Sequence, residues 1–363
     1  MAAVCCAGES GGQRGSEEAG QVSQVRVERL VYSRAQTAPR PRCAAAPLSM
    51  IHLLFTGGTI SMQRDPVAGG NIPAHGGEAL VRFAPELEKV GPYRIENWAM
   101  VPACHLGPEQ LWALRNRVSQ VAHSGEVQGI VVTHGTDTLE ETAYLLDRTL
   151  QLDVPVALTG AMRTSSDVDW DGPRNLVDAA VVAADAGSRG RGAMVVFHHN
   201  VFAGRTAVKV DTTALDAFAA PHTAPIGRVA NGRVSYSSGS DPNRPPRLNG
   251  IPARVALVPA VIGDDGRLLD LARPHYDGVV VEAFGSGNLP PGLVPAIQRW
   301  LNEGKPVVLA SRCPLGQVTP LYAFEGGGSR LVEMGVVAAG ARAPSQARME
   351  LAIALSAGIP YGS

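Results

Sequence analysis

Residues 50–61 read MIHLLFTGGTIS, a largely apolar run that passes directly into a turn rich in glycine and threonine. A run of this kind, ending in glycines, is typical of a buried strand that opens an α/β domain. Three similar runs follow along the chain: GIVVT at 129–133, VPVAL at 154–158 and GAMVVF at 192–197. Because helical patterns separate these runs, the alternation predicts a mostly parallel sheet covered by helices on both faces.

Two helices are well marked in this part of the chain. The first follows GIVVT, and its apolar residues fall on one stripe at Leu139, Ala143, Leu146 and Leu150. Asp137 with Glu140 forms a candidate capping box at the start of this helix. The second helix follows Asp171, where Pro173 suits the first turn. Both helices are expected to cover the sheet.

The polar stretch SYSSGSDPNRPPRLNG at 235–250 is rich in proline and has no apolar period, which predicts a linker. We therefore expect a larger N-terminal domain over 49–236, a linker over 237–253 and a smaller C-terminal α/β domain over 254–363. In the last of these the same alternation resumes on a smaller scale. A chain of 363 residues is long enough for two domains, since single cores usually stop growing at roughly 250–300 residues.

Residues 1–48 mix Gly, Ala, Arg, Ser and Pro without a helical or strand period, and we expect them to form a disordered extension. Met50 is then a candidate for the true start of the protein. A targeting peptide is the competing interpretation, but Glu17, Glu18 and the lack of an amphipathic stripe argue against it.

Composition and charge exclude several classes of protein. The chain carries 32 basic and 33 acidic side chains, a formal net charge of −1, and no basic block, which argues against nucleic-acid binding. No apolar run approaches the roughly 20 residues that cross a bilayer, so no membrane segment is expected. Five scattered cysteines suit reduced thiols, and with the lack of a secretory signal they indicate a cytoplasmic protein. No metal site is expected either, since His198 and His199, as neighbours on a strand, would face opposite sides.

Polar residues follow four of the predicted strands, at the edge where ligands of open α/β sheets bind. The segments are TGGT at 56–59, HGTDT at 134–138, TGAMR at 159–163 and GSGN at 285–288. We expect all four to converge on one crevice.

Each of the first two segments has a simple structural interpretation when taken alone. TGGT predicts a tight turn in which glycines adopt positive φ, and HGTDT predicts a helix cap. Neither the GK[ST] ending of a phosphate-binding loop nor a GxGxxG pattern is present. Together, however, the two segments supply a threonine hydroxyl as a candidate nucleophile and glycine amides that donate hydrogen bonds to an oxyanion. Thr136, Asp137 and Lys209, one of three lysines in the chain, offer a candidate proton relay.

The segments TGGTI, VTHGTDTLEETAYLLD, LTGAMR, DGPRNL, GRTAVKVDTT and GSGN, in this order, resemble the bacterial-type L-asparaginases. The resemblance covers about residues 50–360. It implies a larger N-terminal and a smaller C-terminal α/β domain, and active sites shared between subunits of a homodimer or homotetramer. It also implies hydrolysis of L-asparagine, a small amino-acid amide, to L-aspartate and ammonia, without a metal or cofactor.

The same resemblance assigns roles to individual residues. Thr56 matches the threonine that attacks the side-chain amide and carries the acyl group. Thr136, Asp137 and Lys209 match the triad in which the lysine draws the proton from the second threonine, while the backbone amides of Gly57 and Thr136 polarise the carbonyl. Asn288 matches an asparagine that reaches a neighbouring subunit's site, although an ordinary turn asparagine fits its position equally well. The implied substrate-binding set is Gly57, Ala103, Cys104, Gly135, Ala161 and Asn288.

Two departures from the family pattern concern substrate binding. Residues 60–92 contain no tyrosine, whereas relatives carry one on the mobile loop after TGGTI. His75 or Asn71 is a candidate substitute, and the alternative is a loop that only shields the site. Ala103 occupies the place of a serine that binds the α-carboxylate, with Cys104 and His105 as rim residues.

These departures leave the nucleophile and the triad intact, so they bear on which amide is bound and not on the hydrolysis. Asparagine is favoured, but glutamine differs by one methylene, which a pocket discriminates by only ~1–3 kcal/mol. The alternatives are a related amidohydrolase acting on glutamine or another small amide, and a non-catalytic relative that binds an amino acid.

Overall fold

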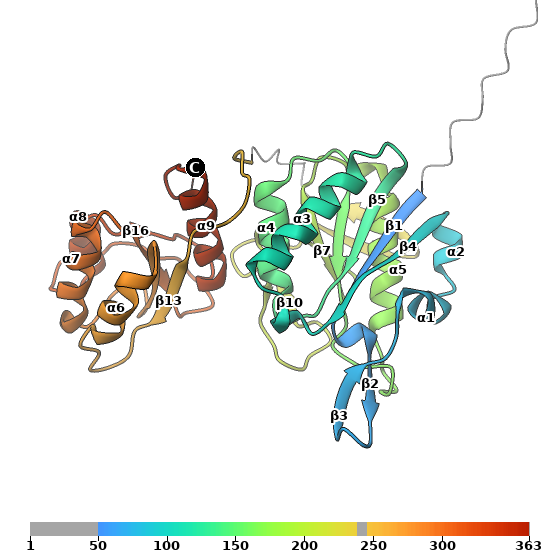
Figure 1. Ribbon diagram of the computed structural model, residues 1–363, viewed down its shortest axis with the longest axis horizontal. Coiled ribbons are helices and arrows are strands. Elements are labelled where there is room, and N and C mark those ends of the chain that lie inside the picture. Colours follow the sequence, from blue (N-terminus) through green and yellow to red (C-terminus); the bar gives the residue numbers. More distant parts are fainter. Residues whose placement is uncertain (1–49, 238–244, 363) are drawn as a thin grey trace, which may run out of the picture. The chain divides into compact units, whose positions relative to one another are not determined.

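The computed structural model describes residues 50–237 and 245–362, so the predicted extension over 1–48 and part of the predicted linker lie outside the described residues. The larger sheet has eight strands in the order β12-β11-β8-β7-β6-β5-β1-β4 (Figure 1). Its five parallel strands are β1 (Met50–Gly57), β4 (Tyr93–Val101), β5 (Val127–Thr133), β6 (Val156–Thr159) and β7 (Ala193–Phe197). The antiparallel edge is formed by β8 (Asn200–Ala203), β11 (Gly227–Ala230) and β12 (Arg233–Tyr236).

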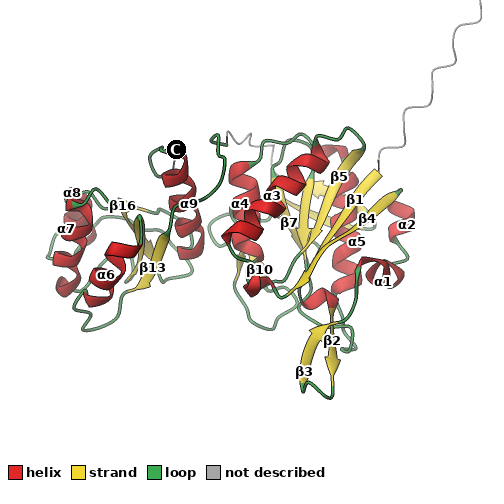
Figure 2. Ribbon diagram, viewed as in Figure 1, coloured by secondary structure: helices red, strands yellow, loops and turns green. Residues whose placement is uncertain are grey.

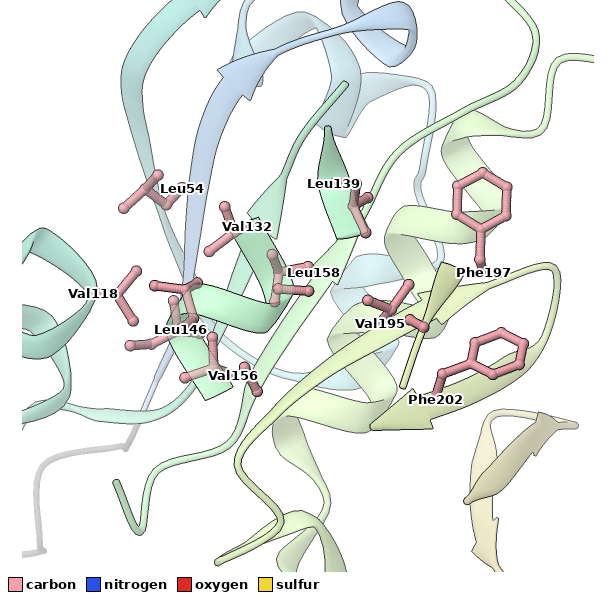
Figure 3. Packing of buried hydrophobic residues seen from close by; sticks show 14 of the residues in the cluster. Leu54, Val118, Val132, Leu139, Leu146, Val156, Leu158, Val195, Phe197 and Phe202 are labelled. Carbon is pink, nitrogen blue, oxygen red and sulfur yellow. The ribbon is translucent and has the colours of Figure 1, made fainter. Parts of the chain in front are cut away.

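Helices cover both faces of this sheet, which explains why its strands are apolar throughout. One face packs on α3 (Pro108–Ala122) and α4 (Leu139–Thr149). Figure 3 shows this layer, with Leu54, Val132 and Leu158 from the strands beside Val118 and Leu146 from the helices. The opposite face packs on α1 (Gly77–Arg82), α2 (Leu87–Val90) and α5 (Gly172–Ala184).

The chain reverses its winding between β1 and β5. The helices that follow β1 lie on one face, whereas α4, which follows β5, lies on the other. Such a switch point opens a crevice at the carboxyl ends of the two strands, because their connections leave in opposite directions. The TGGT and HGTDT turns follow these two strands.

A second, smaller sheet of four parallel strands follows the predicted linker: β13 (Val255–Pro259), β14 (Gly278–Ala283), β15 (Val307–Ser311) and β16 (Val337–Ala338). Three helices pack on one face, namely α6 (Arg267–Ala272), α7 (Val294–Asn302) and α8 (Gly328–Glu333). The other face is covered by α9 (Pro344–Ala357). The predicted fold class, with a larger mostly parallel sheet and a smaller α/β layer, is confirmed.

Figure 2 shows β2 (Met62–Asp65) and β3 (Gly70–Pro73) as a hairpin that extends beyond the larger sheet. It belongs to the segment between β1 and α1, where the sequence predicted a mobile loop. None of the helices in the described residues is long and apolar enough to span a membrane.

Two local predictions were wrong. No side chain caps α4, whose N-cap residue is Thr138, because the carboxylates of Asp137 and Glu140 bind elsewhere. His198 and His199 do not lie on a strand: they form the turn between β7 and β8, with φ of 45° and 67°. The reason is that the sheet changes from parallel to antiparallel at this point, so the chain must reverse within two residues.

Candidate active site

The turn after β1 depends on two glycines in the left-handed region of backbone conformation. Gly57 has φ of +105° and Gly58 has φ of +84°. A Cβ on Gly57 would lie 2.6 Å from the backbone of Val101, and one on Gly58 would lie 2.4 Å from the Cα of Gly135. No other residue fits either position, so the turn after β1 lies directly against the end of β4 at Gly57 and against the turn after β5 at Gly58.

Thr56 lies at the end of β1 and is buried, with 1% of its surface exposed. Its hydroxyl donates a 2.8 Å hydrogen bond to the carbonyl of Thr133, the last residue of β5. A backbone carbonyl orients the hydroxyl but is not a base. Thr56 therefore needs another group to take its proton before its oxygen becomes a good nucleophile.

The turn after β5 makes equally close contacts on its other sides. A Cβ on Gly135 would lie 2.6 Å from the Cβ of Ala103, and one on Gly160 would lie 2.4 Å from the carbonyl oxygen of His134. The structure thus brings together three of the four strand-end segments, TGGT, HGTDT and TGAMR, along with Ala103.

Lys209 joins this cluster from β9 (Val208–Lys209), which pairs with β10 (Phe218–Ala219). Its ammonium donates to the hydroxyl of Thr136 at 3.0 Å and to the carboxylate of Asp137 at 2.9 Å. The side chain of Lys209 is 17% exposed, against 71% for that of Asp137. As an ammonium, Lys209 holds the Thr136 oxygen in place, and it accepts the Thr136 proton only after losing one of its own.

A carboxylate that the sequence assigned to a capping box holds the backbone of Lys209. Glu140 accepts a 2.7 Å hydrogen bond from the Lys209 amide and a 2.6 Å bond from the hydroxyl of Ser345. The two bonds leave Glu140 no role at the start of α4. The bond to the Lys209 amide fixes β9 against α4, so the backbone from which the Lys209 side chain extends to Thr136 is held in place.

The TGAMR segment is held by residues of DGPRNL, the motif that begins α5. Asp171 accepts hydrogen bonds from the backbone amides of Met162 and Arg163 at 3.0 and 2.9 Å. The Asn175 amide donates at 3.0 Å to the Gly160 carbonyl and to Asp171. Ala161, a predicted substrate-binding residue, is fully buried within this held loop.

Ala103 and Cys104 lie in a single 3₁₀ turn, Ala103–His105, after β4. Ala103 is 5% exposed, and its carbonyl accepts a 3.2 Å bond from the hydroxyl of Thr138. Cys104 and His105 are exposed. The methyl of Ala103 therefore contacts the cluster, while the two rim residues face solvent.

Neither candidate substitute for the missing tyrosine is directed at Thr56. The His75 ring bonds through Nε2 to the hydroxyl of Ser165 at 2.8 Å and packs against Phe83. Asn71 is exposed on β3. Within the described residues, no hydrogen bond joins either side chain to Thr56.

Asn288 lies in the smaller α/β layer, in the turn after β14. Its Oδ1 accepts a 3.4 Å bond from the Gly328 amide, and its backbone bridges to Phe284. No hydrogen bond in the described part of the chain joins it to Thr56 or Lys209. The expectation that all four strand-end segments converge holds for three of them, because GSGN belongs to a different sheet.

A cavity of about 540 Å³ adjoins Lys209, and its lining includes four arginines: Arg148, Arg205, Arg312 and Arg342. Arg148 pairs with the buried Glu350 and Arg205 with the buried Asp147, so part of this positive charge is neutralised. Sequence reasoning missed the cavity because its walls come from residues far apart in the chain. Among the described residues, no group of three or more His, Cys, Asp or Glu side chains is placed to hold a metal ion.

His134 is another residue that sequence reasoning missed. It is fully buried, with Nδ1 2.9 Å from the Gly135 carbonyl oxygen and Nε2 3.0 Å from the hydroxyl of Thr142. Burial lowers the pKa of His134 to about 4. The only signal in the sequence was its position between the strand and the TDT segment.

These features define an α/β protein with a candidate catalytic site at the switch point of a mostly parallel sheet. The model of the asparaginase N-terminal domain matches residues 50–241, and that of the glutaminase/asparaginase C-terminal domain matches residues 254–360. The chain therefore belongs to the asparaginase family, and the resemblance seen in the sequence motifs is confirmed.

Individual relatives agree with this membership. The chain is 39% identical to a probable L-asparaginase of Deinococcus radiodurans over 86% of its own length and 95% of the relative's. It is 29% identical to a glutaminase-asparaginase of Pseudomonas aeruginosa, over 74% and 77% of the two chains. The crystal structure of a probable cytoplasmic L-asparaginase from Campylobacter jejuni has a TM-score of 0.75 at 27% identity, covering 85% of this chain and 95% of that one.

The contact between the two turns predicts a large difference between two glycine substitutions. Gly58→Ala adds both left-handed strain and a collision with Gly135, whereas Gly232→Ala, at φ +70° with open space around it, adds strain alone. We expect Gly232→Ala to cost about 1 kcal/mol of unfolding free energy and Gly58→Ala to cost clearly more. Urea unfolding of both variants measures this, and equal losses would show that the turns do not press on each other.

Burial of His134 predicts a pH-dependent contribution to stability. Its folded pKa of about 4 lies below the ordinary value of 6.5, so the unfolded state binds the proton more readily. The stabilisation is fully present above pH 6.5 and declines as the pH falls toward 4, by about 1.4 kcal/mol per pH unit.

Urea unfolding of wild type and His134→Asn from pH 7 to pH 4 isolates this contribution, because the other titrating groups are shared. We expect the stability difference between the two proteins to shrink or reverse as the pH falls. A constant difference would contradict the shifted pKa.

Proposed function

We propose that the chain hydrolyses L-asparagine to L-aspartate and ammonia through an acyl-enzyme on Thr56. Membership of the asparaginase family makes it an amidohydrolase of the asparaginase type. The single observation that best supports the threonine mechanism is the contact between the two turns. It sets the buried hydroxyl of Thr56 on one side and the Lys209–Thr136–Asp137 group on the other.

In the proposed first step, Thr56 Oγ1 forms a bond to the side-chain amide carbon and the C–N bond breaks. The proton of Thr56 ends on the departing nitrogen, which leaves as ammonia. In the second step, the water oxygen forms a bond to the acyl carbon, the ester bond to Thr56 Oγ1 breaks to release L-aspartate, and one proton of the water restores the Thr56 hydroxyl. Each step passes through an oxyanion, for which the backbone amides of Gly57 and Thr136 are the proposed donors.

The Lys209–Thr136–Asp137 group is the proposed proton relay. Thr136 is 4% exposed, and its oxygen already accepts a bond from Lys209, so its own proton is free to be donated. Once Lys209 is deprotonated, it draws that proton and Thr136 becomes a proton acceptor for the reacting group. Asp137 stabilises the ammonium at 2.9 Å and, being largely exposed, is also the proposed partner of the substrate's amino group.

Glutamine or another small amide is the second candidate substrate. A relative named as a glutaminase-asparaginase supports it. Asparagine and glutamine carry the same α-carboxylate, so Ala103, whose methyl offers no hydrogen bond where a serine would bind that group, bears only on an amide of another kind. A non-catalytic relative that binds an amino acid is the third candidate, and Cys104 and His105 at the exposed rim are compatible with all three.

We also propose that the protein is a cytoplasmic homodimer or homotetramer in which Asn288 completes the site of a neighbouring subunit. Its proposed domains are an N-terminal domain over 49–236 and a C-terminal domain over 254–363, joined by a linker over 237–253. Separation of Asn288 from the Thr56 cluster within one chain supports the shared site. The cytoplasmic description of the Campylobacter jejuni protein supports the location. The domain limits lie close to those of the two matching family models.

Sedimentation velocity tests the assembly. We expect a dimer or tetramer at micromolar concentration, and ammonia release by Asn288→Ala reduced without a change in the sedimentation coefficient. A fully active monomer would contradict the shared site.

Loss of either proposed proton-transfer group predicts loss of turnover with folding retained. We expect ammonia release from asparagine to fall to background in Thr56→Ala and by about 10²–10⁴-fold in Lys209→Met, since Lys209 contributes acid–base catalysis. Lys89→Met, which alters an exposed lysine on α2, is the matched control and should keep wild-type activity. Thermal melting verifies folding in each variant.

The same assay, run with asparagine and glutamine, separates the three candidate functions. Turnover that survives Thr56→Ala would contradict the covalent mechanism. Faster turnover of glutamine would favour the second candidate. A ligand-induced rise in melting temperature without any ammonia would favour the binding protein.

A further inference from the structure

His134 lies between the last residue of β5 and the peptide that carries the Thr136 amide. Its imidazole is fully buried, so each ring nitrogen must find a partner within the protein. Nδ1 lies 2.9 Å from the Gly135 carbonyl oxygen, and Nε2 lies 3.0 Å from Thr142 Oγ1. Thr142 belongs to α4, so the ring connects the turn after β5 to the helix that follows it.

The two partners fix the proton on one nitrogen. A carbonyl oxygen accepts hydrogen bonds and cannot donate, so Nδ1 carries the hydrogen and donates to the Gly135 oxygen. A neutral ring then presents a lone pair at Nε2, which accepts from the hydroxyl of Thr142. His134 therefore holds the Gly135 carbonyl through a donor that is itself held by α4.

The orientation of this carbonyl decides where the Thr136 amide points. In a trans peptide the C=O of one residue and the N–H of the next point in opposite directions within one plane. Since the Gly135 oxygen faces the His134 ring, the Thr136 N–H faces away from it. Among the hydrogen bonds of the described residues, none uses this N–H, although Thr136 is only 4% exposed.

A buried backbone N–H without a partner is rare in native proteins, because an unmet donor costs about as much as a lost hydrogen bond. The surrounding turns leave the peptide little freedom to rotate: Gly135 lies against Ala103 and Gly58, and a Cβ on Gly160 would lie 3.3 Å from Thr136 Cγ2. The unpartnered donor is thus held in the turn after β5, whose residue Gly135 contacts the TGGT turn at Gly58.

We propose that His134 is a positioning residue for the oxyanion donor, and that its Nδ1–H holds the Gly135–Thr136 peptide with the Thr136 amide directed at the substrate carbonyl. This inference rests on the proposed function, because it takes the Thr136 amide as an oxyanion donor. It assigns the imidazole no proton transfer: the ring never contacts the substrate, and it acts only through the peptide plane.

A merely structural histidine would fill space and satisfy its own polar atoms. Its replacement would then lower stability, and any loss of activity would follow the loss of folded protein. A positioning role predicts instead a fall in kcat with little change in KM, because an oxyanion donor acts on the transition state more than on the bound substrate.

Asparagine and leucine form a matched pair at position 134. The two side chains share the same branching, but only the asparagine amide places an N–H donor where Nδ1 lies. His134→Gln is a second variant without a donor at this place, since its amide extends to the position of Nε2. Thr142→Val removes the partner of Nε2 and leaves the Nδ1 bond in place.

The experiment measures kcat and KM for asparagine in these four variants, with melting temperatures and crystal structures. We expect His134→Asn to keep a kcat close to that of wild type. In His134→Leu and His134→Gln we expect a loss of kcat approaching the roughly 10²–10³-fold that removal of one oxyanion donor causes, with KM little changed. Thr142→Val should lower the melting temperature and reduce kcat far less than His134→Leu does, because the Nδ1 bond to Gly135 remains.

Equal kcat in His134→Asn and His134→Leu, or losses that follow melting temperature alone, would overturn the proposal. Crystal structures supply a readout that needs no activity: the Gly135–Thr136 peptide should keep its orientation in His134→Asn and rotate in His134→Leu. An unrotated peptide in His134→Leu would also overturn it. If wild type releases no ammonia from asparagine, the proposed function fails, while the peptide orientation still decides whether His134 positions the amide.

Discussion

The close contact between the turn after β1 and the turn after β5 is the constraint on which the rest of this site depends. Glycines at 58 and 135 remove every side-chain atom from the contact, so the backbones of two turns occupy space that a single methyl would fill. Because β1 and β5 are paired, with Phe55 opposite Thr133, the Thr56 hydroxyl reaches the carbonyl at the end of β5. Strand pairing brings these two ends together at one edge of the sheet, and the glycine contact keeps the turns that follow them together beyond it.

Around this contact, each proposed functional group is held by a residue outside the reaction. Glu140 holds the backbone of Lys209, Asp171 and Asn175 hold the loop that contains Ala161, and His134 holds the peptide of Thr136. Groups fixed in this way lose little freedom when a substrate binds, and fixed donors stabilise developing charge better than mobile ones.

Much of the fold followed from the sequence because its signals are local. The strand at 129–133, which the structure extends to Val127–Thr133, and the helix with the stripe through Leu146 were both predicted, since burial on two faces leaves continuous apolar runs. The wrong predictions came where one local sequence pattern is compatible with two different sets of contacts. Asp137 and Glu140 have the spacing of a capping box, yet both carboxylates bind Lys209, about 70 residues away in the chain. The Lys209 ammonium donates to Asp137, and the Lys209 backbone amide donates to Glu140.

The sequence by itself determined the family and the two α/β layers and named Thr56, Thr136, Asp137 and Lys209 as candidate catalytic residues, because residue types and their order are enough for a motif. Only the tertiary structure decided which of these meet. It brought Lys209 to Thr136, left Asn288 in the other sheet, and turned His134 toward the Gly135 carbonyl. The physical reason is that hydrogen bonds extend only about 3 Å, so they depend on the packing of distant segments, which no local pattern encodes.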